Sequence, residues 1–473
     1  MITVKAAGSV SAAWIALLPV LALCGHPALA APPGAAGSVR NVELSANGSG
    51  LAASVPKIAV DPRDPQRLAV IWRYVSTAPF GSQPQSPQSW ICHLSLSTDG
   101  GRHFADQTLD WRRPRTPRCN APYVFYASNG DLYVGATLMG AGTAAHGRVP
   151  PFGRVVIRRS VDGGRTWSDT ESVIATDSQS RFAANPAIPA AARLVPWDGA
   201  SGVIDRQTGD IFASGGYPAP PGGAAHSQRF FAGSSDRGAT WGPIRAFGGV
   251  GWPQRWDGDM AAAHGTFAVS YIADGAAGSH APCPCVVFGT SRDGGRTLHR
   301  HYVTSVTNID TLVHYPPLAA DPVRKGAYSF ALVSDDARQV SVWTTADDGN
   351  HWTTATLLQT ADLVKVSRPA LAYTSNGMLV VMWRGAHADG SFDVYVAAAR
   401  QDLRFGGAVR LSTAPSHIPP ALLSNYAVRG DFIDSVTAAA GRIYAAWTDW
   451  RTGAEGRVYF GSVPLGTVLA ARR

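Results

Sequence analysis

The sequence predicts an all-β protein, a seven-bladed β-propeller of four-stranded antiparallel blades, with six blades as the alternative. Three observations predict this fold. The chain of 473 residues is rich in glycine (50) and proline (33), is only 16% charged, and has no long helical pattern. One short phrase recurs along the chain, and a pair of apolar segments around a turn precedes each copy. Repeats of this kind indicate a ring or a solenoid with one structural unit per repeat.

The recurring phrase has the form Ser-x-Asp-x-Gly-x-Thr-Trp. Its copies begin at Ser97, Ser160, Ser234, Ser291 and Thr345, and a degraded copy begins at Ala398. The aspartate can accept hydrogen bonds from backbone amides of a tight turn, the glycine tolerates a positive φ, and the final aromatic side chain buries apolar surface. A catalytic acid is needed once per site rather than once per repeat. We therefore predict a structural role for the five aspartates Asp99, Asp162, Asp236, Asp293 and Asp347.

Seven apolar hairpins can be counted independently of the phrase. Each has Gly, Asn, Asp or Pro at its bend, as hairpin turns require. Runs such as LAVIW and LVVMW are typical of strands buried on both faces. The hairpins cover residues 57–72, 123–138, 201–215, 259–272, 317–333, 369–383 and 435–447.

The two ends of the predicted ring have to be joined. The seventh unit has no obvious fourth strand, whereas residues 39–45 have strand composition and no partner in their own unit. Propellers commonly close their ring by lending a terminal strand across the seam. We therefore predict that residues 39–45 complete the seventh blade.

The N-terminus has the pattern of a secretory signal peptide over residues 1–30: Lys5, an apolar run, and small residues ending at Ala30. The apolar run is shorter than the roughly 20 residues that span a bilayer, so a membrane anchor is the weaker alternative, and a lipoprotein modified at Cys24 is weaker again. We expect a secreted or periplasmic monomer without stable membrane insertion. Its expected parts are a flexible leader (31–38), one propeller domain (39–467) and a C-terminal tail (468–473).

Loss of the signal peptide would lower the formal net charge from +8 to +7 and leave four cysteines. Two disulfides are compatible with an exported protein, and the pairing of Cys92, Cys119, Cys283 and Cys285 stays open. The spacing of Cys-Pro-Cys is not that of a zinc site, and we expect no metal and no cofactor. Basic residues are scattered and no nucleic-acid-binding module is present, so we expect no nucleic-acid partner. Binding of acidic sugars remains possible.

The recurring phrase resembles the Asp-box, or bacterial neuraminidase repeat, of sialidases and related secreted propellers. Five copies at blade spacing carry this resemblance, which covers nearly all of the mature chain. It implies a propeller of the sialidase superfamily and a glycan or glycoconjugate as partner. It implies little about activity, because Asp-boxes of that family lie away from the active site.

Propellers bind ligands at one mouth of the central channel, where the segments before the innermost strands converge. Sialidases hold the sugar carboxylate with three arginines, and use a tyrosine assisted by a glutamate as nucleophile and an aspartate as acid/base. By this resemblance, a clamp would consist of Arg255, Arg368 and Arg429. The aspartate would be one of Asp198, Asp257, Asp259 and Asp431. The nucleophile would be Tyr426 or Tyr315, and Trp197 and Trp256 would stack on a sugar ring.

The sequence also departs from the sialidase pattern. The Arg-Ile-Pro signature is replaced by SVPKIAV, the only glutamates are Glu43, Glu171 and Glu455, and sialidases have six blades. Two interpretations therefore remain: a secreted exo-glycosidase acting on glycans at the channel mouth, and a non-catalytic propeller of the cell envelope that binds a glycan or a protein. A deep pocket with paired carboxylates or an arginine clamp would favour the first, and mutually paired charges would favour the second.

Overall fold

The structure is a computed structural model. It describes residues 39–45, 50–77, 90–109, 111, 118–139, 153–169, 171–175, 198–218, 227–249, 252–275, 281–307, 316–357, 362–399, 403–420, 434–453 and 455–471. Residues 37–473 form one compact unit, which contains all the described strands. The expected signal peptide and leader (1–38) lie outside the described residues and stay predictions.

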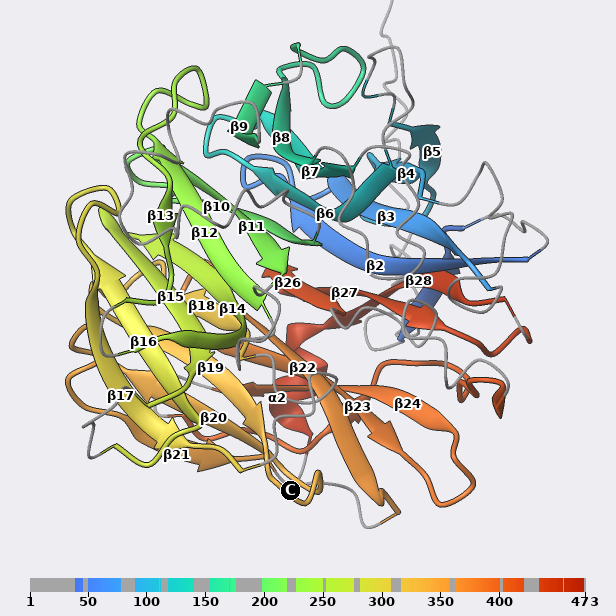
Figure 1. The fold of residues 1–473 in the computed structure, drawn as a ribbon. Helices are drawn as coiled ribbons and strands as arrows, with labels where there is room; N and C mark the ends of the chain where they lie inside the picture. Colours follow the sequence, from blue (N-terminus) through green and yellow to red (C-terminus); the bar gives the residue numbers. More distant parts are fainter. Residues whose placement is uncertain are drawn as a thin grey trace, which may run out of the picture. The chain divides into compact units, whose positions relative to one another are not determined.

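The described strands form seven four-stranded antiparallel sheets (Figure 1). The prediction of seven blades is therefore confirmed, and the six-bladed alternative is wrong. Blade 1 consists of β2 (Leu51–Val60), β3 (Leu68–Ser76), β4 (Cys92–Ser97) and β5 (Ala105–Thr108). Blade 2 consists of β6 (Arg118–Tyr126), β7 (Leu132–Met139), β8 (Gly153–Ser160) and β9 (Glu171–Ala175). Blade 3 consists of β10 (Asp198–Ile204), β11 (Ile211–Pro218), β12 (Ser227–Ser234) and β13 (Arg245–Ala246).

The remaining blades follow the same order of strands. Blade 4 consists of β14 (Gln254–Ala263), β15 (Thr266–Ala273), β16 (Cys285–Ser291) and β17 (His299–Ser305). Blade 5 consists of β18 (Leu318–Ala320), β19 (Tyr328–Val333), β20 (Val340–Thr345) and β21 (Thr353–Thr356). Blade 6 consists of β22 (Lys365–Tyr373), β23 (Leu379–Ala386), β24 (Phe392–Ala399) and β25 (Val409–Arg410). Blade 7 consists of β26 (Ser435–Ala439), β27 (Arg442–Asp449), β28 (Arg457–Pro464) and the N-terminal β1 (Arg40–Glu43).

The N-terminal strand closes the ring. β1 pairs antiparallel with β28, with Arg40 opposite Ser462 and Glu43 opposite Tyr459. The innermost strands contact one another in sequence around the ring, and β26 of the last blade also contacts β2 of the first. The prediction that residues 39–45 complete the seventh blade is confirmed. Both termini of the propeller are thereby held in one sheet, which leaves no unpaired edge at the seam.

The hydrophobic core is divided among the interfaces between blades. Each of the seven interfaces has its own cluster of buried apolar side chains within the described residues. Trp72, Trp383 and Trp447 are fully buried on the second strands of blades 1, 6 and 7. The seven predicted hairpins are the first two strands of the seven blades, so these strands pack on neighbours through both faces. Their almost continuous apolar sequences follow from that position.

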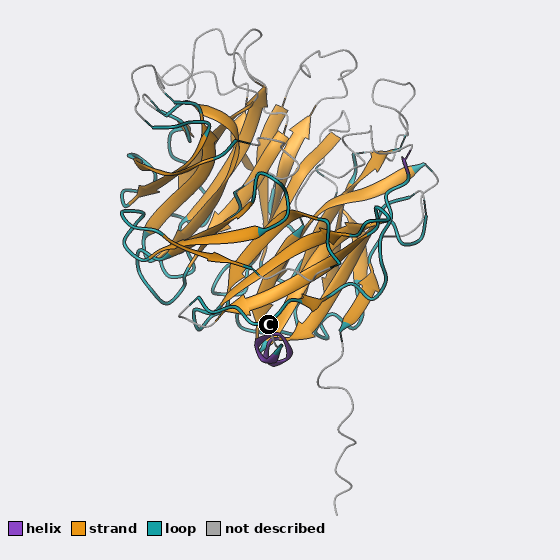
Figure 2. Ribbon diagram, turned by 90° about the horizontal axis from the view of Figure 1, so that it is seen from below, coloured by secondary structure: helices purple, strands orange, loops and turns teal. Residues whose placement is uncertain are grey.

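A short helix, α2 (Leu465–Ala470), follows β28 and contacts β24, β27 and β28. It lies beside the C-terminus in Figure 2, which otherwise shows strands and loops. Leu465 and Val468 are buried against the sheets. Packed structure therefore continues past residue 467, where we expected the domain to end. Among the described residues, no helix has the length and apolar character needed to cross a membrane.

The four cysteines within the described residues form two disulfides. Cys92 pairs with Cys119 and thereby joins β4 of blade 1 to β6 of blade 2. Cys283 pairs with Cys285 within blade 4. The pairing left open by the sequence is thus one bond between neighbouring blades and one local bond.

Candidate functional site

The repeated turns lie at one end of the ring, which we call the turn end. In a four-stranded antiparallel sheet, the connection from the third to the fourth strand lies opposite the point where the first strand begins. In the blade 2 turn, Ser160 Oγ donates to Asp162 Oδ1 (2.8 Å) and accepts the Gly164 N–H (2.7 Å), while Asp162 Oδ1 accepts the Thr166 N–H (2.9 Å). The other four copies have the same three bonds.

These bonds keep the turn carboxylates ionised. The side-chain hydrogen bond from Thr240 is the main cause that lowers the pKa of Asp236 to about 2, and the backbone hydrogen bond from His351 does the same for Asp347. Hydrogen bonds also lower the pKa of Asp99, Asp162 and Asp293. Each carboxylate is thus engaged by its own turn. Together with their position opposite the start of the innermost strands, this gives the five aspartates a structural task.

The opposite end, where the innermost strands begin, we call the mouth. Four of these strands, β2, β6, β10 and β22, have a β-bulge at the same place. One residue of each bulge has a left-handed backbone: Val55 (φ 49°), Ala121 (φ 43°), Gly199 (φ 68°) and Arg368 (φ 53°). A bulge bends its strand and redirects the side chains that follow it. The same β-bulge therefore recurs around the mouth, and the side chains that follow it differ from blade to blade.

Lys57 follows the bulge of β2 directly, at the point where pairing with β3 resumes. Its ammonium interacts electrostatically with Asp259 of blade 4, Arg229 of blade 3 and Asp434 of blade 7. A side chain of blade 1 can approach groups of blades 3 and 4 only across the channel. Lys57 is partly accessible but surrounded by protein, and this desolvation is the main cause that lowers its pKa to about 8. Lys57 therefore lines the channel as a weakly solvated cation.

Asp259 faces Lys57 from β14. Its Oδ1 accepts the N–H of Met260 (2.9 Å), and its Oδ2 accepts the N–H of Leu318 (3.1 Å) in the next blade. Gly258 precedes it at a position where a Cβ would lie 1.9 Å from the carbonyl oxygen of Ser270, so only glycine fits there. Asp259 is half-buried. Backbone donors on two blades thus hold this carboxylate beside the channel.

Two buried arginines near the channel have structural partners. Arg384 of β23 forms an ion pair with Asp434, at side-chain exposures of 4% and 2%, and its guanidinium lies 4.6 Å from the ring centroid of Phe392. Arg229 of β12 donates to the backbone carbonyls of Gly258 and Gly199. It therefore joins the innermost strands of blades 3 and 4. Arg384 thus joins blades 6 and 7, and Arg229 joins blades 3 and 4.

The predicted arginine clamp is only partly within the described residues. Arg255 forms an ion pair with Asp274 of its own blade (Nη1–Oδ1, 2.8 Å), and both side chains are about one quarter exposed. Arg368 is buried on the bulge of β22. Arg429, the third member, lies outside the described residues. No described contact brings Arg255 and Arg368 together, and the clamp stays a prediction.

The other predicted site residues divide into two groups. Asp198 lies in β10, and Trp256 and Asp257 lie in β14, but the structure describes only their backbone. The second group lies outside the described residues and consists of Trp197, Tyr315, Tyr426 and Asp431. Of the predicted acids, Asp259 is thus the one whose side-chain contacts are known.

Lys57 and the bulges are site features that were not predicted from the sequence. A signal for the bulges was present, because three of the four bulged strands have Ser or Asn two residues before a proline: Ser54-Val-Pro, Asn120-Ala-Pro and Ser367-Arg-Pro. Lys57 follows the first of these triplets directly. Its interaction with residues of blades 3, 4 and 7 depends on the closed ring, so it cannot be predicted from a local sequence pattern.

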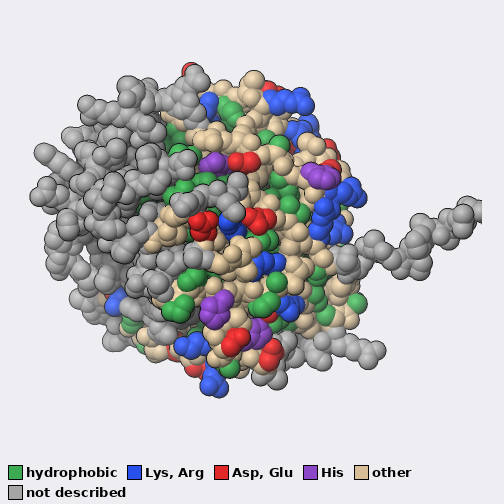
Figure 3. Space-filling model, turned by 90° about the vertical axis from the view of Figure 1, so that its right-hand side faces the viewer, with side chains coloured by type: hydrophobic (Ala, Val, Ile, Leu, Met, Phe, Trp, Pro, Cys, Tyr) green, Lys and Arg blue, Asp and Glu red, His purple; other side chains and the backbone are tan. Residues whose placement is uncertain are grey.

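Neither sign of charge dominates the described part of the face shown in Figure 3. In Figure 3, basic, acidic and histidine side chains are interspersed on the described part of one face. Within the described residues, no group of three or more His, Cys, Asp or Glu side chains could hold a metal ion.

The fold is similar to that of several glycoside hydrolases. The GH93 α-L-arabinofuranosidase of Fusarium graminearum, solved with arabinobiose, aligns with a TM-score of 0.50 and 12% identity over 90% of this chain and 98% of that chain. The α-L-arabinanase of Penicillium chrysogenum, also solved with arabinobiose, aligns with a TM-score of 0.48 and 14% identity over 91% of this chain and 99% of that chain. Trypanosoma rangeli sialidase aligns with a TM-score of 0.47 and 15% identity over 76% of this chain and 58% of that chain. No protein-family profile and no curated protein matches the sequence. At these identities the likeness concerns the fold alone.

Proposed function

We propose that this protein is an exported, sialidase-like propeller that binds a glycan at the mouth of its central channel and hydrolyses a terminal glycosidic bond there. The observation that carries the proposal is the electrostatic interaction of Lys57 of blade 1 with Asp259 of blade 4, whose carboxylate is held by two backbone N–H groups. The repeated turn, with its resemblance to the Asp-box, supports the superfamily. Arabinobiose and difluorosialic acid, bound to the propellers named above, suggest arabinosides and sialosides as the first substrates to test.

The proposed chemistry uses two carboxylates. Glycoside hydrolysis generally needs a pair of them, roughly 5 to 10 Å apart, on either side of the scissile bond. Asp259 is one, because its two backbone donors fix its orientation and its half-buried position keeps it close to the channel. Asp198 or Asp257, on β10 and β14, is proposed as the second. Lys57 is proposed to bind a hydroxyl or carboxylate of the sugar through its ammonium.

A second function is favoured by one observation. Arg384 pairs with Asp434, and Arg255 pairs with Asp274, so these charges are neutralised within the protein. Mutual pairing is what a non-catalytic propeller would show, one that binds a glycan or a protein of the cell envelope. In that case Lys57 and Asp259 would contribute to binding without turnover.

The test is a panel of chromogenic arabinofuranosides, sialosides and common hexosides, assayed with the mature protein and with Asp259→Asn. If Asp259 is the acid/base, the substitution should lower kcat by about 10²- to 10⁴-fold. The matched control is Asp64→Asn, an exposed acid in the hairpin turn of blade 1, which should leave kcat unchanged. Glycan binding without turnover by any variant would leave the binding interpretation. If the protein neither binds nor hydrolyses any of these glycans, both proposed functions are wrong.

The pH dependence of binding gives a second measurement of the same site. Because the pKa of Lys57 is lowered to about 8, its ammonium is present at pH 7 and is lost as the pH rises through about 8. The affinity for a sialoside should therefore fall over that range. In Lys57→Met the affinity should be weak at pH 7 and should no longer change near pH 8. An unchanged alkaline decline in this variant would remove Lys57 from the proposed site.

A further inference from the structure

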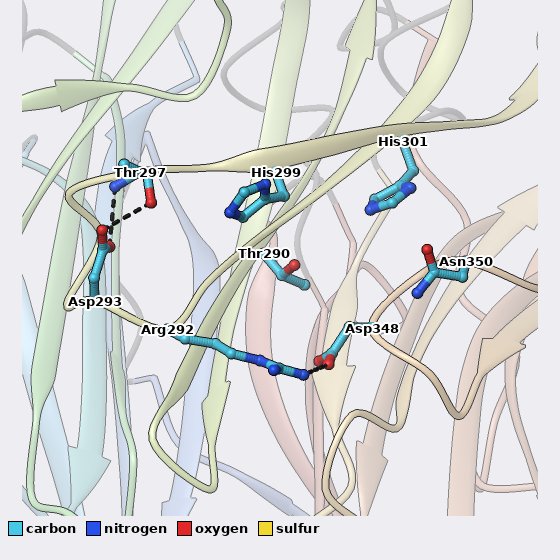
Figure 4. Close-up of a pocket in the computed structure, with 8 residues that line it drawn as sticks. All are labelled: Thr290, Arg292, Asp293, Thr297, His299, His301, Asp348 and Asn350. Carbon is cyan, nitrogen blue, oxygen red and sulfur yellow. Dashed lines mark hydrogen bonds and ion pairs between the residues drawn. The ribbon is translucent and has the colours of Figure 1, made fainter.

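A polar pocket separate from the channel lies between blades 4 and 5 at the turn end (Figure 4). Its volume is about 400 Å³, which is within the range of small-molecule sites. Its walls come from β16, β17 and the repeated turns of both blades. The lining side chains that matter here are Thr290, Arg292, His299, His301, Asp348 and Asn350.

The walls of the pocket are held by regular structure. His299 and His301 are two residues apart on β17, so their side chains share one face of the strand and project toward the pocket (Figure 4). Opposite them on β16 are Thr290 and Phe288. The turn of blade 5 sits directly on blade 4, since a Cβ at Gly349 would lie 2.5 Å from the Phe288 ring. A ligand would meet a largely preformed surface, which lowers the entropic cost of binding.

One buried hydrogen-bonding group of the pocket is unused within the described residues. Asp348 Oδ2 is paired with Arg292, but Asp348 Oδ1 is buried and accepts no hydrogen bond within the described part of the chain. Asp348 has a left-handed backbone, with φ of 59°, and its side chain is 16% exposed. A buried acceptor without a donor is unfavourable, because it has lost water and gained no replacement. Asp348 Oδ1 has almost no accessible surface, so a ligand donor would reach it only after the Asp348 side chain turns toward the pocket.

The lining restricts the chemistry of the ligand. The charges of Arg292 and Asp348 cancel, and a second carboxylate, Asp293, lies at the rim, so an anion is disfavoured. The histidine, threonine and asparagine side chains offer both donors and acceptors. A hydroxyl group is itself donor and acceptor, and several hydroxyls on a rigid ring would match such a set. The volume suits one or two sugar rings.

We propose that this pocket is a second carbohydrate-binding site, specific for a neutral saccharide of one or two rings. One hydroxyl donates to the Asp348 carboxylate, whose side chain turns toward the ligand, and others exchange hydrogen bonds with His299, His301 and Asn350. The site lies on the outer strands and turns of two neighbouring blades, and it does not rest on the function proposed for the channel. It would let the protein hold a glycan at the turn end while the mouth stays open.

The test uses the two histidines as local probes. The protein is labelled with ¹³C in the histidine rings, and the peaks of His299 and His301 are assigned by their loss in His299→Ala and His301→Ala. Lactose, maltose, cellobiose, xylobiose and arabinobiose are then added in turn. At least one should shift both peaks with a Kd on the order of 1 to 10 mM, and should leave the peak of His103, an exposed histidine of the blade 1 turn, unchanged.

Two further variants decide whether the shift reports the proposed contacts. Asp348→Asn should weaken binding by about tenfold or more, because Arg292 retains the amide oxygen and the second carboxylate oxygen is replaced by an NH2 donor. His103→Ala, the matched control on a different blade, should bind as the wild type does. If Asp348→Asn does not fold, Asn350→Ala takes its place with the same expectation. Failure of all five disaccharides to move either peak, or a shift with inorganic phosphate alone, would overturn the proposal, whatever the glycosidase assays show.

Discussion

The two ends of the ring repeat in different ways. At the turn end the same residue types recur and make the same bonds, as in Ser160 with Asp162 and in Ser291 with Asp293. At the mouth four innermost strands bulge at the same place, but the residues that resume pairing are a lysine, a tyrosine, a serine and an alanine: Lys57, Tyr123, Ser201 and Ala370. Side chains and hydrogen bonds that recur from blade to blade indicate a structural role. A repeated backbone with varied side chains allows one site to be assembled from unlike groups.

The largest effect should come from a mouth charge that belongs to the scaffold. Arg384→Met leaves Asp434 buried without its partner and should lower the free energy of unfolding by about 3 to 5 kcal/mol. The matched control Arg255→Met breaks a pair that is about one quarter exposed and should cost less than about 1 kcal/mol. Urea unfolding of both variants measures the difference. If both variants lost the same free energy of unfolding, burial would not distinguish the structural ion pairs from the other charges at the mouth.

A smaller effect is expected for glycines of one repeated turn. Gly295 has φ of 84°, and a Cβ there would lie 2.5 Å from the Phe231 ring, whereas Gly294, with φ of 72°, faces open space. Gly294→Ala should cost about 1 to 2 kcal/mol for the left-handed backbone alone. Gly295→Ala adds a steric clash with the neighbouring blade and should cost about 1 to 3 kcal/mol more.

Thermal or urea unfolding of the two alanine variants tests this difference. Gly294→Ala is the control, since it shares the turn and the sign of φ but lacks the contact. Equal losses would show that the turn does not bear on the neighbouring blade. That result would weaken the assignment of the turn end as scaffold.

The smallest effect concerns pH and the turn carboxylates. A depressed pKa means that Asp236 stabilises the fold above its ordinary value of 3.8, and that this contribution is lost as the pH falls toward about 2. Stability should therefore fall between pH 4 and about 2, and Asp236→Asn should reduce the slope in that window. Thr240→Val removes the main hydrogen bond responsible and should reduce it in part. An unchanged slope in both variants would contradict a structural role for the carboxylate.

Much of the fold could be predicted from local sequence. Each hairpin carries its own turn residues and its own apolar pattern, and each repeated phrase closes its corner with bonds among residues two to four positions apart. The closing strand was predictable because one segment lacked a partner and one blade lacked a strand. Such features are encoded within a few residues, so they can be seen without the ring.

The candidate site could be predicted only in part. Asp259 was among the predicted acids, whereas Lys57 was noted as a departure from the sialidase signature and not as a site residue. The pocket between blades 4 and 5 was not foreseen, because its walls combine β17 with the turn of the next blade.

The sequence by itself determined the strand class, the seven repeats, the corner bonds and the means of closure, because each depends on contacts between near neighbours or on a simple count. Only the tertiary structure decided which cysteines pair, where the bulges lie, and which charges face one another. Lys57 and Asp259 are about 200 residues apart in the chain. Their electrostatic interaction depends on the closure of seven blades into one ring, which no local stretch of sequence encodes.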